Sequence, residues 1–493
     1  MEITTLFKHT PYFILQGNDA LSVNGICDDS RKCSRGKLFI CVRGEQSDGH
    51  DYMKQAIQNG AAAIVVEDLS KTAYLTDKDI LVILVDDTRK ALSHIAAAWF
   101  GYPAKQLRTI GITGTKGKTS TAYMTRSILE AAGIKTGMIG TVETFDGKVS
   151  SGNINTTPSA YEIQESLSRM VNNGCRAVVM EVSSQGMKHF RCDSIHFDVC
   201  AFTNLKPDHI GAGEHKDFFE YRACKSRLFG QCDTGVFNAD DEQTARIIEA
   251  HKCKVRKFSI IGKADYVVND AAKYHDSKFA GMQFEFLNQR IILPYPGIFN
   301  LYNALCAAAI AVESGFGISP ATVSRGLGDC VINGRCEWIH VSDDFAVMLD
   351  YAHNAMSLRV LLKTIREYKP RRLVCLFGCG GNRSKLRRFE MGEASGQLAD
   401  YTIITSDNPR DEEPLEIIAD IVTGIEKTDG KYTVIEDRQR AILHAIKNAD
   451  KGDIIIIAGK GHETYQEIKG VRYPMDDREL IRKAKEETEE NVC

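Results

Sequence analysis

Hydrophobic and polar positions form two recurring patterns along the chain. Short apolar runs, such as residues 177–182, 197–202 and 454–458, are typical of strands buried on both faces of a parallel sheet. Longer segments, such as residues 87–100, carry apolar residues three or four positions apart, which is the spacing of an amphipathic helix. Because the two patterns alternate along most of the chain, the predicted fold class is α/β, with parallel sheets covered by helices.

The alternation is most regular in the last third of the chain. The predicted strands there are residues 346–350, 373–377, 402–405, 432–435 and 454–458, and the predicted helices are residues 356–368, 389–398, 414–425 and 439–449. This order predicts a doubly wound, Rossmann-like sheet. The charged tail, residues 477–490, is expected to form a solvated helix.

The central part of the chain opens with a predicted strand at residues 109–113 and a helix at residues 119–132. Ser159 and Glu162 form a capping box that begins another helix, which is expected to end near Gly174. Further elements expected in this part are strand pairs between residues 256 and 295 and an apolar helix at residues 300–314.

Two breaks divide the chain. Gly101-Tyr102-Pro103 ends a helix, and Asn333-Gly334 interrupts the pattern again. We therefore predict three domains: a smaller N-terminal α/β domain (1–105), a central domain with a parallel sheet (106–332) and the C-terminal Rossmann-like domain (333–493).

Composition narrows the class of protein. The chain has 493 residues, 43% hydrophobic and 26% charged, which excludes a disordered or collagen-like chain. Its 62 basic and 65 acidic residues give a net charge of −3, so nucleic acid is not an expected partner. The apolar runs are too short for membrane insertion, and the N-terminus lacks the features of a signal peptide, so a cytoplasmic location is expected. The 15 cysteines contain no CxxC pair and are expected to be reduced, buried thiols.

A glycine-rich turn carries the strongest chemical signal. It reads Gly114-Thr115-Lys116-Gly117-Lys118-Thr119-Ser120 and lies between a predicted strand and a predicted helix. Backbone N–H groups and a helix N-terminus in such a turn bind phosphates, the lysine neutralises their charge and the Thr119 hydroxyl can join a Mg²⁺ shell. The loop is shorter than the common P-loop spacing, and the alternative is a plain tight turn. We predict a P-loop for ATP.

Two further polar residues follow the ends of strands. Glu181 ends the strand at residues 177–182, and His209 comes shortly after the strand at residues 197–202. Carboxyl ends of parallel strands beside a P-loop are suitable places for metal ligands. The alternatives are a surface glutamate and a structural histidine.

Together these motifs resemble the Mur ligase family of ATP-dependent amide-forming enzymes, and within it the members that add the third residue of the peptidoglycan stem. The matching motifs run from Asp29 to Gln466. In the family, the N-terminal domain holds a uridine nucleotide, and central residues hold the muramoyl dipeptide attached to it. The residues that the resemblance assigns to this substrate are Ser30, Glu45, Gln46, Ser47, Asn155, Thr156, Thr157, Ser183, His189 and Arg191.

The resemblance also implies the catalytic and metal-binding residues. Lys225 matches a lysine that CO₂ carbamylates in the family, which turns a cation into an anion able to hold Mg²⁺; alone, it reads as an ordinary helix lysine. The implied catalytic residues are Lys118, Glu181, His209 and Lys225, and the implied metal ligands are Thr119, Glu181, His209 and carbamylated Lys225. The implied ATP-binding residues are Gly114, Thr115, Lys116, Gly117, Lys118, Thr119, Ser120, Asn300, Asn303, Arg335, Asp350 and His353.

A last set of motifs bears on the amino acid that is added. In the family, Asp407-Asn408-Pro409-Arg410 goes with meso-diaminopimelate, whose second carboxylate suits the bidentate forks of two arginines. The residues assigned to this substrate are Arg383, Asp407, Asn408, Pro409, Arg410, Gly459 and Glu463, with Glu463 receiving the distal ammonium. Asp407-Asn408-Pro409 alone would also suit a turn.

The expected activity is therefore ATP-dependent addition of meso-2,6-diaminopimelate to UDP-N-acetylmuramoyl-L-alanyl-D-glutamate through an acyl phosphate, by a monomer acting on small molecules. The alternatives are a lysine-adding or other Mur-type ligase, and a non-catalytic regulatory paralogue. Lys116, His189 and Asn354 stand where the family usually has other residues, which is typical of a divergent branch.

Overall fold

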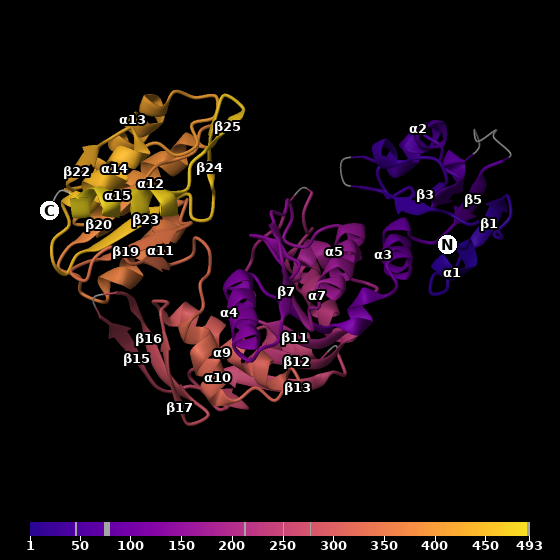
Figure 1. Cartoon of the computed structure of the whole chain (residues 1–493), viewed down its shortest axis with the longest axis horizontal. Helices are drawn as coiled ribbons and strands as arrows, with labels where there is room; N and C mark the ends of the chain where they lie inside the picture. The colour runs from indigo at the N-terminus through magenta and orange to yellow at the C-terminus, as the bar shows by residue number, and fades with distance from the viewer. Residues whose placement is uncertain (45–46, 73–78, 212, 250, 277, 491–493) are drawn as a thin grey trace. The chain divides into compact units, whose positions relative to one another are not determined.

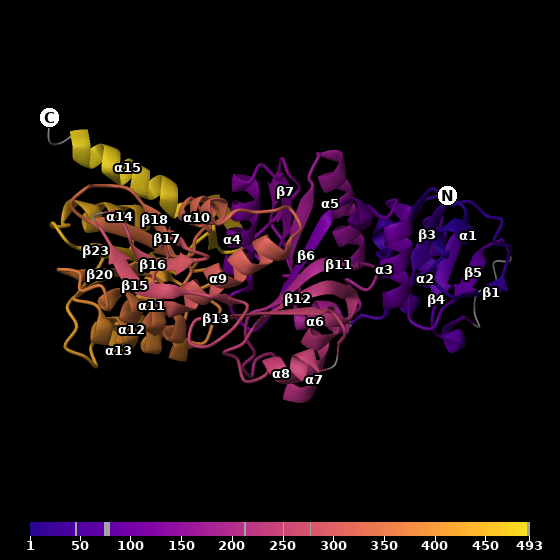
Figure 2. The same cartoon turned by 90° about the horizontal axis from the view of Figure 1, so that it is seen from below.

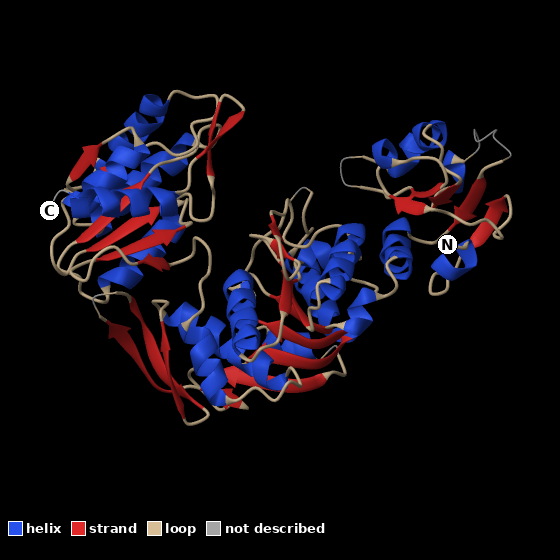
Figure 3. Cartoon of the chain, in the orientation of Figure 1, coloured by secondary structure: helices blue, strands red, loops and turns tan. Residues whose placement is uncertain are grey.

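The computed structural model describes residues 1–490 apart from residues 45–46, 73–78, 212, 250 and 277. The described chain divides into two compact units, and each is treated by itself. Unit 1 comprises Met1–Val267 and Leu305–Gly326, and unit 2 comprises Val268–Ala304 and Leu327–Cys493. Helices α9 (Ile298–Glu313) and α10 (Pro320–Gly328) contribute residues to both units. Strands and helices alternate along most of the described chain (Figure 3), which confirms the predicted α/β class.

Unit 1 begins with a five-stranded sheet. Its spatial order is β1 (Phe13–Gln16), β5 (Leu81–Leu84), β4 (Ala63–Val66), β3 (Lys37–Ile40) and β2 (Gly25–Cys27), with β1 antiparallel at the edge. The helices of this part are α1 (Ile3–Leu6), α2 (Met53–Gln58) and α3 (Thr88–Trp99). Ile83 of β5 and Ile95 of α3 belong to one core, as the helical spacing of residues 87–100 predicts.

The second sheet of unit 1 has nine strands (Figure 1). Its spatial order is β14 (Tyr266–Val267), β13 (Lys254–Ser259), β12 (Cys232–Asn238), β11 (Phe197–Phe202), β6 (Arg108–Thr113), β10 (Ala177–Glu181), β7 (Thr136–Ile139), β8 (Thr144–Phe145) and β9 (Ser150–Ser151). The strands from β14 to β7 are parallel, and β8 and β9 continue antiparallel. Strands β6, β10 and β11 are neighbours, so the residues that follow them share one edge.

Helices cover this sheet. They are α4 (Lys118–Ala131), α5 (Ala160–Asn172), α6 (Ser184–Lys188), α7 (Phe218–Ser226) and α8 (Thr244–Ile248). Leu167 of α5 and Ile247 of α8 share a core with Phe197, so these helices lie on the same face of the sheet. The capping box at Ser159 and Glu162 is present, as predicted.

Unit 2 contains a three-stranded antiparallel sheet and a six-stranded sheet. The small sheet consists of β15 (Asn269–His275), β16 (Ala280–Phe286) and β17 (Gln289–Leu293). The prediction of strand pairs between residues 256 and 295 is therefore confirmed for β15–β17. It is also confirmed for β13 and β14, which pair with each other in the parallel sheet of unit 1.

The six-stranded sheet has the order β18 (Glu337–Ile339), β19 (Ala346–Asp350), β23 (Ile454–Ala458), β20 (Leu373–Phe377), β21 (Tyr401–Ile404) and β22 (Tyr432–Val434). All its strands are parallel except β18. Its helices are α11 (Ala355–Arg366), α12 (Lys385–Leu398), α13 (Pro414–Ile425), α14 (Arg438–Lys447) and α15 (Asp477–Glu490), and a hairpin of β24 (Tyr465–Ile468) and β25 (Val471–Pro474) precedes α15. The predicted order of strands and helices is confirmed throughout.

Two predictions in unit 2 need correction. Helix α12 begins at Lys385, before the predicted start at residue 389. The prediction missed the first turn because that turn is mostly charged and shows no apolar periodicity. Helix α15 is not a fully solvated helix: Leu480, Ile481 and Ala484 are buried in the core that includes α14. The charge of this segment hid its narrow apolar stripe, and Figure 2 shows α15 beside α14.

Among the helices that the structure describes, none combines the length and apolar character needed to cross a bilayer.

Candidate active site

The P-loop joins β6 to α4 and adopts a backbone that only glycine fits at two positions. Gly114 has a φ of 152°, and a Cβ there would overlap Thr203 Oγ1. Gly117 has a φ of 86° and directly precedes α4. The loop is hydrogen-bonded to Asn204, which follows the neighbouring strand β11. Thr115 N donates to Asn204 O at 2.8 Å, and Lys116 N donates to Asn204 Oδ1 at 3.0 Å. The N-terminus of a helix of this length, reached through a glycine turn, is a site for phosphate.

Lys118 folds back over this loop. Its Nζ donates to Gly114 O at 3.0 Å and to Thr115 O at 3.2 Å. Loss of solvent lowers the pKa of Lys118 from its ordinary value, and the nearby Glu181 carboxylate opposes that shift. The side chain is therefore held in the position where it can neutralise a phosphate bound to the loop.

Glu181 ends β10 and points to the first turn of α4. It is 1% exposed and accepts hydrogen bonds from Thr119 Oγ1 at 2.9 Å and from Thr141 N at 2.9 Å. Gly140 makes this position possible, since a Cβ there would overlap Glu181 Oε1. A hydroxyl and a carboxylate in contact are hard oxygen ligands of the kind that Mg²⁺ prefers. Thr119 and Glu181 thus fit a magnesium ion.

Lys225 reaches the same loop from α7. It is 2% exposed, and its Nζ donates to Gly114 O at 2.8 Å. Burial, with the neighbouring Lys118 charge, holds the pKa of Lys225 well below its ordinary value. The side chain is therefore not the exposed helix lysine that sequence alone would suggest. Mg²⁺ prefers oxygen ligands, so the lysine nitrogen does not suit it, and Lys225 fits Mg²⁺ only after conversion to an anion with carboxylate-like oxygens.

His209 takes a different position. It has a φ of 54°, is exposed, and its Nδ1 lies 2.8 Å from Glu214 Oε1. Within the described part of the chain, no group of three His, Cys, Asp or Glu side chains is placed to hold a metal. The structure thus brings Lys118, Thr119, Glu181 and Lys225 together on the P-loop, while His209 pairs with Glu214.

Several residues assigned to the nucleotide-sugar substrate meet beside Glu181. Thr157 Oγ1 donates to Glu181 O at 2.9 Å and to Ser183 Oγ at 3.1 Å. Arg191 Nη1 donates to Thr157 O at 2.6 Å, and Thr156 Oγ1 lies 2.9 Å from Thr141 Oγ1. The loop at residues 155–157 is thereby tied to the strand that carries Glu181.

The other assigned residues are more dispersed. Asn155 is exposed, and His189 follows α6 as its C-cap. Ser30 is buried in the five-stranded part, where its Oγ donates to Gln55 Oε1 at 2.7 Å. Ser47 is exposed, and Glu45 and Gln46 lie outside the described residues.

In unit 2, the residues assigned to the adenine and ribose side of ATP form two buried groups. Asn303 Nδ2 donates to Asn300 Oδ1 at 3.3 Å within α9. Asp350 accepts from Cys336 N at 2.7 Å and from Ala352 N at 2.8 Å, and burial raises the pKa of Asp350.

Arg335 and His353 both lie close to Tyr351. The Arg335 guanidinium stacks over the Tyr351 ring at 4.9 Å, and His353 Nδ1 lies 2.8 Å from Tyr351 O. Burial lowers the pKa of His353, which keeps its imidazole neutral at neutral pH. Sequence reasoning did not single out Tyr351, which has no signal beyond its place between two assigned residues.

The residues assigned to the amino acid come from three loops at the carboxyl ends of β20, β21 and β23. Asn408 Nδ2 donates to Glu463 Oε2 at 2.7 Å, which joins two of these loops. Arg410, with a φ of 52°, donates from Nη1 to Gly381 O at 2.7 Å. Gly459 has a φ of 110°, and a Cβ there would lie 2.9 Å from Asp407 Oδ2.

These loops leave one arginine to solvent and pack the other residues closely. Arg383 is exposed, whereas a Cβ on Gly381 would overlap Pro409 O. Two buried cations near these loops, Lys460 and Arg438, were not assigned from the sequence. Lys460 lies between Gly459 and Glu463, which the sequence did assign, so burial was the missing information.

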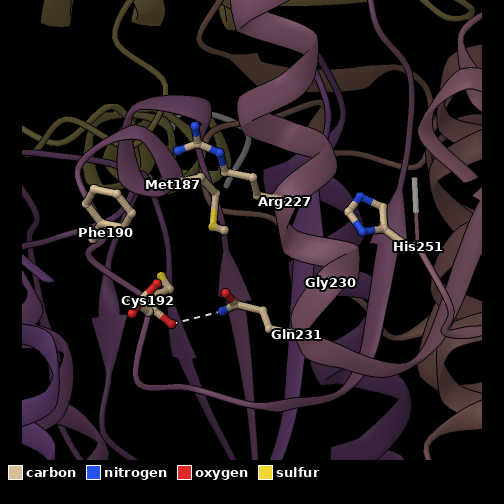
Figure 4. A pocket seen from close by; sticks show the side chains of 8 residues that line it. Met187, Phe190, Cys192, Arg227, Gly230, Gln231 and His251 are labelled. Atoms are coloured by element: carbon tan, nitrogen blue, oxygen red, sulfur yellow. Dashed lines mark hydrogen bonds between the residues drawn. The ribbon is translucent and has the colours of Figure 1, made fainter. Parts of the chain in front are cut away.

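A cavity of about 320 Å³ lies elsewhere in unit 1. Figure 4 shows Phe190, Arg227 and His251 around it, with Gln231 donating to Cys192 O. None of the described residues that line it belongs to the predicted site.

Family models match three consecutive segments: "Mur ligase family, catalytic domain" at residues 22–100, "Mur ligase middle domain" at residues 112–311 and "Mur ligase, glutamate ligase domain" at residues 334–461. The chain is 41% identical to a UDP-N-acetylmuramoyl-L-alanyl-D-glutamate–2,6-diaminopimelate ligase of Caldanaerobacter subterraneus subsp. tengcongensis, over 99% of this chain and 100% of that protein.

The chain belongs to the Mur ligase family. A ligase of the same name from Clostridium perfringens is 37% identical over 98% of this chain and 99% of that protein. A solved structure with that name matches this Mur ligase with a TM-score of 0.73 and 27% identity, over 99% of both chains. The predicted family and fold are thus confirmed, and the division into three domains stays a prediction.

Proposed function

We propose that this Mur ligase joins an amino group of meso-2,6-diaminopimelate to the D-glutamyl carboxylate of UDP-N-acetylmuramoyl-L-alanyl-D-glutamate, with conversion of ATP to ADP and phosphate, as a step of peptidoglycan synthesis. The observation that supports this most directly is the convergence of Lys118, Glu181 and Lys225 on the P-loop. It occurs in a chain 41% identical over its length to a ligase of that name.

The chemistry proceeds in two balanced steps. A carboxylate oxygen of the dipeptide attacks the γ-phosphorus of ATP, and ADP leaves, which produces an acyl phosphate. The neutral amine of the amino acid then attacks the acyl carbon, and inorganic phosphate leaves with its bonding electrons while the amine loses a proton. Such reactions depend mostly on positioning and charge neutralisation by the protein.

Each residue at the P-loop has a distinct part in this proposal. The backbone of residues 114–120 holds the ATP phosphates, and Lys118 neutralises charge as the γ-phosphoryl group transfers. Magnesium, held by Thr119 and Glu181, supplies further neutralisation at the phosphates. Lys225, as its carbamate, and His209 complete the proposed metal ligands.

The two other substrates are proposed to use the remaining assigned residues. Thr157, Ser183 and Arg191 orient the dipeptide carboxylate beside Glu181, with Asn155, Thr156 and His189 nearby in sequence. The uridine part is assigned to Ser30 and the turn of Glu45, Gln46 and Ser47. The ATP base and ribose are assigned to Asn300, Asn303, Asp350 and His353, and Arg335 is assigned to an ATP phosphate.

The amino-acid site is proposed from charge. Arg383 and Arg410 face the second carboxylate of diaminopimelate, and Glu463 faces its distal ammonium. Asp407, Asn408, Pro409 and Gly459 shape the two loops around it. Lysine lacks the second carboxylate and would leave arginine charge without a partner, so diaminopimelate is the favoured substrate.

Phosphate release in the presence of ATP, Mg²⁺ and the UDP-dipeptide tests this proposal. The assay is run with meso-diaminopimelate, with L-lysine, with L-glutamate and with no amino acid. We expect diaminopimelate to give a kcat/KM at least about 100-fold above that of lysine. A higher value with lysine would show a lysine-adding enzyme, and a folded protein that binds ATP without turnover would show a regulatory paralogue.

Lys118→Ala is the matched inactive control. It should lower turnover by roughly 1,000-fold or more while the fold is kept. A fully active Lys118→Ala protein would contradict the assignment of the P-loop.

The proposal also includes a cytoplasmic location, because ATP and nucleotide sugars are cytoplasmic metabolites. It further includes a monomeric enzyme, and light scattering measures that oligomeric state.

A further inference from the structure

Lys460 is a fully buried lysine in the loop that follows β23. Its exposed fraction is 0%, and it stands between two glycines of positive φ, Gly459 at 110° and Gly461 at 53°. Burial of an ammonium group carries a large free-energy cost unless hydrogen bonds and an opposite charge offset it. A lysine kept in such a position therefore calls for a reason beyond packing.

Three acceptors surround the Lys460 ammonium. Its Nζ donates to Asn408 Oδ1 at 3.2 Å and to Tyr465 O at 2.5 Å, and it lies 3.5 Å from Glu463 Oε2. An ammonium has three N–H donors, so these acceptors match its full capacity. Two of them, Asn408 and Glu463, belong to the loops assigned to the amino-acid substrate.

Lys460 and the Glu467 backbone N–H together fix which way the Asn408 amide points. Asn408 Oδ1 accepts from Lys460 Nζ and from Glu467 N at 2.9 Å, and both of these groups are donors only. The opposite orientation would place the amide NH₂ against two donors. Asn408 Nδ2 must therefore face Glu463, to which it donates at 2.7 Å.

Glu463 is thereby held on one side only. Both the Asn408 hydrogen bond and the Lys460 ion pair use Oε2. Within the described part of the chain, neither contact involves Oε1. Because the carboxylate is planar, the two contacts at Oε2 also fix the direction of Oε1. The Glu463 side chain is 20% exposed, so it is not sealed from solvent.

We infer that Lys460 is a positioning residue for the amino-acid substrate: it orients the Asn408 amide and the Glu463 carboxylate, so that Glu463 Oε1 can accept the distal ammonium of a diamino acid. The inference rests on the proposed function, which assigns Glu463 to that ammonium. It adds a residue that touches no substrate and acts through two that do.

Kinetics of Lys460→Met test this role, because Met keeps the length of the side chain and removes its charge. We expect the KM for diaminopimelate to rise by about tenfold or more, while the KM values for ATP and the UDP-dipeptide stay within about twofold. Equal changes in all three KM values, or no change in the first, would overturn the inference. Lys451→Met, whose side chain is 87% exposed, is the matched control and should leave all three constants unchanged.

A double-mutant cycle with Glu463→Gln separates positioning from simple destabilisation. If Lys460 acts through Glu463, the Lys460→Met change raises the KM for diaminopimelate much less in the Glu463→Gln background than alone. If the two effects on KM multiply independently, the inference fails.

A second variant covers the case in which Lys460→Met does not fold. Asn408→Asp keeps a partner for Lys460 but removes the N–H that holds Glu463 and adds a like charge beside it. We expect the same selective rise of the KM for diaminopimelate, and an unchanged KM would contradict the inference. Failure of the wild-type enzyme with every amino acid would instead contradict the proposed function, so the two failures are distinguishable.

Discussion

The Nζ atom of Lys225 lies 2.8 Å from the carbonyl oxygen of Gly114, the first glycine of the P-loop. The lysine reaches this oxygen from α7, and its side chain is buried there. Burial and the neighbouring charge of Lys118 hold the pKa of Lys225 well below its ordinary value of 10.5. A neutral lysine amine is a nucleophile, so this position favours reaction with CO₂.

Removal of Lys225 should therefore remove the proposed carbamate anion as well as the amine. We expect Lys225→Ala to lower kcat by roughly 100-fold or more, and added acetate or formate to restore part of the activity by taking the place of the carbamate. Phosphate release at increasing carboxylate concentration measures the rescue. Lys216→Ala, an exposed lysine just before the same helix, should need no rescue. A Lys225→Ala enzyme with full activity, or one that no carboxylate improves, would contradict the carbamate.

The lowered pKa of Lys225 also predicts how stability depends on pH. In CO₂-free buffer the folded lysine loses its proton at a lower pH than the unfolded lysine, whose ordinary pKa is about 10.5. Between the folded pKa and that value the unfolded state binds more protons, so stability rises with pH. We expect Lys225→Met to be more stable than wild type at neutral pH, and the difference to shrink as the pH approaches 10.5. Thermal unfolding of both proteins across this range measures it, and a difference that grows with pH would refute the buried amine.

Gly140 offers a test of Glu181 that leaves its carboxylate in place. A Cβ at residue 140 would overlap Glu181 Oε1, and the carboxylate is held by Thr119 and Thr141, so it must leave its present position. A displacement of about 1 Å at a catalytic group can cost about 100-fold in rate. We expect Gly140→Ala to lower kcat by roughly that factor and to raise the Mg²⁺ concentration needed for activity.

The control for this change is Gly152→Ala. No heavy atom lies within 4 Å of a Cβ built there, so the variant should keep wild-type turnover. Wild-type turnover in Gly140→Ala as well would show that the position of Glu181 is unimportant for the reaction.

The local sequence pattern was sufficient to predict the strands and helices, but it was insufficient to predict the buried ion pairs. The buried strands β19, β20 and β23 and the helix α13 match the predicted ranges, because apolar runs and periodicity are local properties. The P-loop also follows from local sequence, since its glycines precede a helix. The burial of Lys460 is not visible in this way, because it depends on Asn408 from another loop and on the backbone of Tyr465 at the start of β24.

The metal ligands show the same limit. Glu181 and Thr119 meet because β10 pairs with β6 in the sheet. The sequence predicts both strands but does not establish that they are neighbours. His209 pairs with Glu214 in a loop that carries no periodic pattern, so its orientation had no sequence signal. The role of each of these residues in binding Mg²⁺ stays a prediction.

Breaking the pair of Arg438 and Asp477 should destabilise unit 2 more than breaking an exposed ion pair. Both side chains are 0% exposed, and Arg438 donates to the two Asp477 oxygens at 2.7 and 2.6 Å. It also donates to Ser406 O and Ala458 O, which directly precede two of the three loops assigned to the amino acid. Loss of the carboxylate would leave a buried guanidinium without its counterion, which costs about 3–5 kcal/mol.

We therefore expect Asp477→Asn to lower the free energy of unfolding of unit 2 by about that amount and to raise the KM for the amino acid. Trp338 in β18 reports on this unit, so its fluorescence in urea, in a Trp99→Phe background, measures the change. Glu479→Gln is the matched control, because its pair with Arg482 on the same helix is exposed and such pairs contribute about 0–1 kcal/mol. Equal stability of the two variants would show that the buried pair is neutral, and the loops would then owe their positions to backbone contacts alone.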